Sequence, residues 1–71
     1  MPSNPPIEPG QRFRDTQPSL FGRLGSEWVV QEVFVGTDDL WYARVARASD
    51  LTEIKTLSVA VLGDRRRFTP L

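Results

Sequence analysis

Short runs of alternating apolar and polar residues dominate the chain from residue 11 onward, and this period of two predicts strands. Residues 11–15 set one aromatic side chain, Phe13, between polar neighbours. Residues 27–35 are β-branched and aromatic, a composition typical of a strand. The same signals predict three further strands, over residues 40–47, 52–57 and 65–70.

The alternation slips once within residues 27–35. Trp28 and Val30 share one face of a regular strand, whereas Val33 and Val35 lie on the other. One unpaired extra residue near Gln31, a β-bulge, would turn all four to the same side. A bulge also bends the strand, as a small barrel requires.

A hairpin turn is predicted at Gly36–Asp39, where small and acidic residues gather. The returning strand, residues 40–47, has one face that carries Tyr42 and Arg44. We expect this face to lie outside, because both side chains have polar ends. The opposite face is then expected to line the core.

The strand predicted over residues 52–57 follows a second turn, at residues 48–50. Its alternation is interpreted with Ile54 and Thr56 pointing inward and Lys55 pointing outward.

One helical turn is predicted before the last strand. Ser58 is a favourable N-cap, and Gly63 is a favourable stop for residues 59–62. The last strand, residues 65–70, is then expected to bury Phe68.

Two segments fall outside this pattern. Residues 1–9 contain four of the six prolines and predict an extended, disordered, solvated leader. Residues 16–26 form a long polar loop that holds the apolar pair Leu20 and Phe21. This pair either anchors a protein partner or folds back as a lid over the core.

The arrangement of elements over residues 10–71 resembles that of SH3-like small β-barrels, a layout shared by Tudor and KOW-type modules. The resemblance rests on Gly10, Phe13, residues 28–30, residues 36–39, residues 58–63 and Phe68. It implies an all-β, five-stranded SH3-like barrel with one short helical turn before the last strand. It implies a fold and not a function.

Composition narrows the chemistry. The 71 residues make one small domain without cysteine or histidine. Disulfides, thiol or imidazole metal ligands and an imidazole-assisted nucleophile are therefore excluded. Hydroxyl candidates such as Ser19 have no evident base, and the adjacent Asp38 and Asp39 suit a solvated turn. We expect no enzyme, no cofactor and no metal.

The sequence gives few signs of location. The first residues lack the basic and apolar regions of a secretory signal, and no apolar run approaches the roughly 20 residues of a membrane helix. We therefore expect a cytoplasmic protein with no membrane contact. Eight of the nine basic residues are arginine, which is typical of a GC-rich bacterial genome.

Charge leaves two classes of partner open. The formal net charge is zero, yet residues 11–25 and 51–71 are net positive while residues 26–50 are net negative. If the first and last strands are neighbours, one arginine patch could contact RNA or DNA phosphates. Its members would be Arg12, Arg14, Arg65 and Arg67.

The favoured function is a small interaction module that binds a protein partner or a second copy of itself. A chain of this size without a disulfide buries a modest core, so dimerisation would add stability. Unpaired sheet edges accept another strand, and the long loop offers an apolar anchor. The expected partner-binding residues are Leu20, Phe21, Tyr42 and Arg44.

Overall fold

The structure is a computed structural model that describes residues 7–16 and 25–71. It contains five strands and one short helix. They are β1 (Arg12–Asp15), β2 (Glu27–Val35), β3 (Trp41–Arg47), β4 (Asp50–Ser58), α1 (Val59–Leu62) and β5 (Phe68–Pro70). The predictions that fall on Leu20, Phe21 and residues 1–6 lie outside the described residues.

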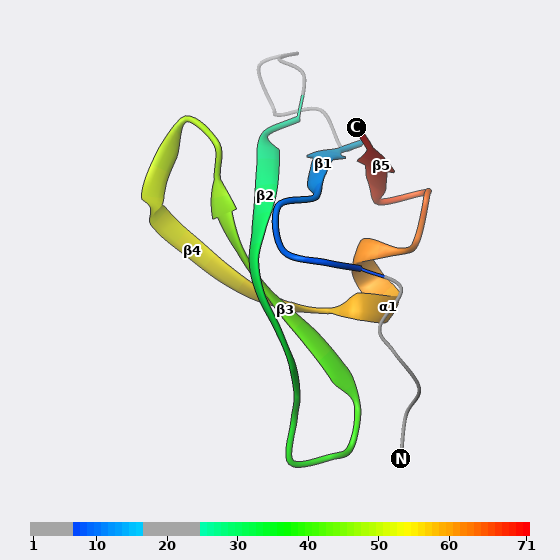
Figure 1. Cartoon of the computed structure of the whole chain (residues 1–71). Coiled ribbons are helices and arrows are strands. Elements are labelled where there is room, and N and C mark those ends of the chain that lie inside the picture. The colour runs from blue at the N-terminus through cyan, green and yellow to red at the C-terminus, as the bar shows by residue number, and fades with distance from the viewer. Residues whose placement is uncertain (1–6, 17–24) are drawn as a thin grey trace.

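The five strands form one antiparallel sheet in the order β4-β3-β2-β1-β5 (Figure 1). The predicted all-β class is confirmed, and β1 and β5 are neighbours as expected. β4 and β5 are the two edges, and no pairing between them closes the sheet in the described part of the chain. β2 is the central strand and pairs with β1 on one side and with β3 on the other.

The predicted β-bulge lies in β2. The β2–β3 register shifts between Val30 and Glu32, so Gln31 has no partner in β3. Upstream of the shift, Trp28 and Val30 are each 2% exposed. Downstream of it, Val33 still packs against the same core. The bulge therefore keeps Trp28, Val30 and Val33 on the core face, whereas the expectation for Val35 is wrong, because this side chain is 42% exposed next to the hairpin turn.

The core lies on this face and is covered by α1. Phe13, Trp28 and Phe68, from three different strands, are buried together as expected. The hydroxyl of Ser58 accepts a hydrogen bond from the Val61 amide and begins α1, as predicted. Val59 and Leu62 of the helix are buried, so α1 covers the core next to β3 and β4.

The expectation of a solvated leader is wrong at Ile7. This side chain is 5% exposed and belongs to the core cluster. The chain next to it is tied to the sheet, because Gly10 donates to the Val30 carbonyl and the Gln11 carbonyl accepts from the Val30 amide. Gly10 has a φ of 93°, which glycine adopts without a steric penalty. At Ile7 the predicted leader therefore reaches the core before β1 begins.

The predicted orientation of β4 is reversed. Lys55 lies over the buried Trp28 ring, whereas Ile54 is 49% exposed on the other face. Leu57 explains the reversal, because its side chain packs against the core. Side chains two residues apart share one face of a strand, so Lys55 points inward with Leu57.

The predicted last strand is also shorter than expected. Arg65, Arg66 and Arg67 lie in a turn, and β5 contains three residues. The Asp64 carbonyl accepts the amides of Arg67 and Phe68, so the backbone turns before it enters the sheet. Strand alternation therefore does not apply to the three arginines.

Candidate interaction surfaces

The outward face of the β2–β3 hairpin holds two of the expected partner-binding residues, Tyr42 and Arg44. The register sets Tyr42 opposite Phe34 and Arg44 opposite Glu32. We call these four residues the hairpin face. The rings of Phe34 and Tyr42 are stacked with centroids 6.0 Å apart, and the Arg44 guanidinium lies 5.3 Å from the Phe34 centroid.

Polar groups on the hairpin face are paired within the chain. Arg44 Nη1 lies 2.5 Å from Glu32 Oε2. The Tyr42 hydroxyl donates to Asp38 Oδ2, and Asp38 Oδ1 accepts the Leu40 amide. The hydrogen bond from Tyr42 lowers the pKa of Asp38, and the same bond raises the pKa of Tyr42. The face is therefore a pre-ordered platform rather than a set of unsatisfied polar groups.

Gly36 lets the Tyr42 ring lie close to the hairpin turn. A Cβ atom at this position would approach Tyr42 Cε2 to 2.6 Å and Asp38 Oδ1 to 2.8 Å. Sequence reasoning did not pair Phe34 with Tyr42, although counting outward from the turn would have found them. The position of the bulge does not affect this count, because the register is regular from Glu32 to the turn.

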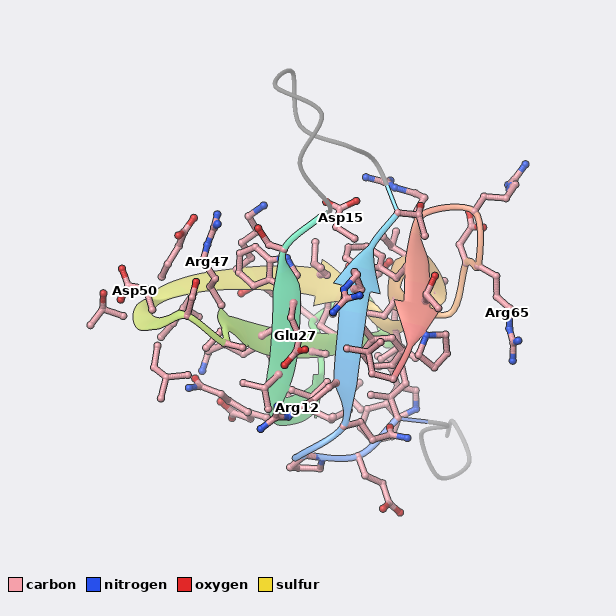
Figure 2. All side chains as sticks on the ribbon, turned by 90° about the horizontal axis from the view of Figure 1, so that it is seen from above. Arg12, Asp15, Glu27, Arg47, Asp50 and Arg65 are labelled. Carbon is pink, nitrogen blue, oxygen red and sulfur yellow. The ribbon has the colours of Figure 1, made fainter. Side chains whose placement is uncertain are left out.

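The structure divides the expected arginine patch. Arg12 and Arg14 leave the same face of β1 and both approach Glu27 of the neighbouring strand. Arg12 Nη1 lies 3.0 Å from Glu27 Oε2, and Arg14 Nη2 lies 3.9 Å from Glu27 Oε1. Arg65 projects from the turn before β5, away from the Arg12–Glu27 pair (Figure 2). Arg67 lies in the same turn as Arg65.

These ion pairs make the positive surface weaker than the sequence suggested. Glu27 offsets part of the charge of Arg12 and Arg14. Asp64 accepts hydrogen bonds from Arg66, which lies between Arg65 and Arg67 in the turn, from Nε at 3.2 Å and from Nη2 at 3.3 Å. Exposed pairs of this kind add little stability, yet they reduce the field that a phosphate would feel.

β4 is the longer exposed edge of the sheet. It spans nine residues, whereas β5 spans three and ends at Pro70, which has no amide hydrogen. On β4, Leu51 is 58% exposed and Ile54 is 49% exposed. Its register against β3 shifts between Ile54 and Asp50, so the intervening residues have no register partner in β3.

Two charged side chains hold β4 against the core face. Lys55 Nζ lies 4.6 Å and Arg47 Cζ lies 5.3 Å from the Trp28 ring centroid. Glu53 Oε2 is 2.6 Å from Arg47 Nε, so this carboxylate fixes Arg47. Two cationic head groups thus lie over the Trp28 ring, which explains how a strand without buried residues stays in the sheet.

One apolar hollow of about 370 Å³ lies where α1 meets the start of β3. Its walls are Leu40, Trp41, Ser58, Val59 and Ala60. The Trp41 indole nitrogen has no hydrogen-bond partner among the described residues. Ser58 already serves as the helix cap, so the hollow lacks converging polar groups that would orient a small ligand.

Within residues 7–16 and 25–71, no three acidic side chains gather into a possible metal site. No described helix has the length and apolar character needed to span a bilayer. Comparisons with protein-family models, with curated proteins and with solved structures found no match. A function can therefore be proposed only from the chemistry of the surfaces described above.

Proposed function

We propose that the chain is a small, non-enzymatic interaction module that binds protein by strand addition at β4. The observation that carries this proposal is the edge itself. Nine residues in extended conformation lie at the border of the sheet, and Leu51 and Ile54 are largely exposed on them. An added strand would satisfy the free backbone groups of β4 and cover both apolar side chains.

The finer fold assignment, an SH3-like barrel over residues 10–71, belongs to the same proposal. Three features support it. The five strands form one antiparallel sheet, β1 and β5 are paired as the resemblance implied, and a capped helical turn precedes β5. In such a barrel the hairpin face lies on the outside, where it can extend a contact that begins at β4.

The hairpin face would act as the second contact. Tyr42 and Arg44 are on β3, next to β4, and Tyr42 is opposite Ser58 while Arg44 is opposite Thr56. A strand added at β4 would lie two strand spacings, about 10 Å, from β3, so its long side chains could reach across Thr56 and Ser58 to the hairpin face. Stacked aromatic and guanidinium groups are favourable anchors in protein interfaces.

The alternative, an RNA- or DNA-contacting module that uses Arg12, Arg14, Arg65 and Arg67, has less support. Two of these guanidinium groups share Glu27, and the other two lie in a turn outside the sheet. The compartment proposed for the module is the cytoplasm, and no cofactor or metal enters the proposal.

A displayed library of random peptides of about ten residues tests strand addition. The chain is used at nanomolar concentration, so that self-association does not compete. Peptides retained by the wild type should be lost with Leu51→Lys and Ile54→Lys and kept with Leu40→Lys. Leu40 is a matched control, because it is 57% exposed but lies at the hairpin turn. Generic RNA and duplex DNA at about 50 mM salt serve as negative controls.

Retention of no peptide would overturn the addition of a foreign strand at β4. Retention that survives both β4 substitutions would also overturn it, because the peptides would then bind elsewhere. Circular dichroism of each variant verifies that the sheet is intact.

A further inference from the structure

The sequence of β4 is nearly self-complementary. From Leu51 to Leu57 it runs Leu-Thr-Glu-Ile-Lys-Thr-Leu. Reversed, this run sets leucine against leucine, threonine against threonine and glutamate against lysine, with Ile54 at the centre. An antiparallel strand of identical sequence therefore meets a like apolar residue, a like hydroxyl or an opposite charge at every position.

We infer that the partner of β4 is the β4 strand of a second copy of this chain, paired antiparallel about a two-fold axis at Ile54. This inference rests on the proposed function, strand addition at β4, and names the occupant. The two sheets then continue into one ten-stranded sheet, because each copy contributes five strands. The interface is isologous, as a two-fold axis requires.

The contacts across the axis are specific. Glu53 of each copy faces Lys55 of the other, which makes two opposite-charge pairs. Ile54, which is 49% exposed in one chain, faces its own copy. Leu51, which is 58% exposed, faces Leu57. Cross-strand pairs of these kinds are the units that stabilise a sheet.

Pairings shifted by two residues in either direction are less favourable than the register centred on Ile54. A shift of the pairing by two residues in one direction sets Lys55 opposite Lys55 and Glu53 opposite Leu57. A shift in the other direction sets Glu53 opposite Glu53 and Leu51 opposite Lys55. Like charges that face each other directly destabilise a sheet, so the charges select the register centred on Ile54.

The described contacts leave these groups accessible. Within the described residues Lys55 has no carboxylate partner, and its ammonium rests on the Trp28 ring. Glu53 is paired with Arg47, but its side chain stays 43% exposed. One strand pair buries less area than a standard interface, so the dimer is weak and forms at high protein concentration.

Cysteine substitution tests the register, and the natural chain has no cysteine to interfere. Ile54→Cys should form an intermolecular disulfide on mild oxidation, because residues directly opposite have Cβ atoms about 4.5–5.5 Å apart. Thr52→Cys and Thr56→Cys should each remain monomeric alone and should form a mixed disulfide dimer when combined. In this register, position 52 of one copy faces position 56 of the other.

Charge mixing tests the same contacts without a covalent bond. In Glu53→Lys a lysine faces Lys55, and in Lys55→Glu a glutamate faces Glu53. Each variant alone should dimerise roughly tenfold more weakly than the wild type, because two attractive pairs become repulsive. A mixture of the two variants restores both opposite-charge pairs, so sedimentation should show the mixed dimer.

The inference is overturned if Ile54→Cys stays monomeric at millimolar concentration while the wild-type chain also sediments as a monomer. It is equally overturned if Thr52→Cys or Thr56→Cys alone cross-links as fast as Ile54→Cys. Neither outcome contradicts the proposed function if displayed peptides still bind at β4. Loss of peptide binding together with intact Ile54→Cys cross-linking would instead restrict β4 to its own copy.

Discussion

At the scale of single residues, the hydrogen bond between Tyr42 and Asp38 orders the hairpin face. The Tyr42 hydroxyl is the donor, and Asp38 accepts with Oδ2 while its Oδ1 binds the Leu40 amide. Asp38 therefore joins the turn to the strand that follows it. The aromatic ring is held over Gly36 and against Phe34 as a consequence.

This hydrogen bond predicts a shifted tyrosine titration. The bond to Asp38 is the main cause that raises the pKa of Tyr42 above its ordinary value of 10.0, followed by desolvation and by the Asp38 charge. Asp38→Ala should return the midpoint toward 10.0, and Asp50→Ala should not. Tyrosinate absorbance measures it directly, because Tyr42 is the single tyrosine of the chain.

The sign of the pH dependence follows from both groups. Because the folded state raises the pKa of Tyr42, its contribution to stability is complete below pH 10.0 and is lost as the pH rises through the folded value. The folded state lowers the pKa of Asp38, so its contribution is present above pH 3.8 and is lost as the pH falls through the folded value. An unchanged tyrosine midpoint in Asp38→Ala would contradict this account.

At the scale of elements, α1 connects the edge strand to the core. It has four residues and depends on the Ser58 hydroxyl, which satisfies the Val61 amide. The same turn buries Val59 and Leu62 and begins where β4 ends. Loss of the cap would therefore loosen both the helix and the end of the proposed interaction edge.

Ser58→Ala should lower the free energy of unfolding by about 1 kcal/mol, because the Val61 amide loses its hydrogen-bond acceptor. Ser58→Thr should retain most of the stability, since threonine also caps helices. Ser49→Ala is the matched control, because Ser49 is exposed in a turn, and it should have almost no effect. Urea denaturation measures all three variants. Equal losses for Ser58→Ala and Ser49→Ala would show that the cap is not important.

At the scale of the whole molecule, a small sheet needs apolar side chains from many parts of the chain to form its core. The core draws on residues from Ile7 to Phe68, so nearly the full described length contributes to it. β4 contributes the partly buried Leu57 to this core and exposes Leu51 and Ile54, which is the reason that we place the proposed strand addition there.

Ile7→Ala should destabilise the domain by about 2–5 kcal/mol, the range for truncation of a buried aliphatic side chain. Ile7→Val should cost about 0.5–1.5 kcal/mol and gives a measurable value if the alanine variant unfolds. Leu71→Ala, at a position 59% exposed, should stay within about 0.5 kcal/mol of the wild type. Chemical denaturation gives each value. An Ile7→Ala effect as small as that of Leu71→Ala would contradict the burial of Ile7.

Much of the fold was predictable because local patterns determine it. The break in the apolar–polar alternation within residues 27–35 predicted the β-bulge that the β2–β3 register contains. Ser58 and Gly63 predicted α1, and the outward position of Tyr42 and Arg44 followed from the period of two. Of the candidate site, these two residues were placed correctly next to each other on one face.

The sequence by itself determined where along the chain strands occur, although not where the last one begins, together with the cap and the self-complementary run around Ile54, because backbone propensity and residue order are local properties. Only the tertiary structure decided that this run lies at an open edge, since sheet order depends on contacts between distant segments. It also decided that Ile7 is buried, that Lys55 covers Trp28, and that Glu27 stands between Arg12 and Arg14. Each of these depends on which surfaces meet across the sheet, and no local pattern contains that information.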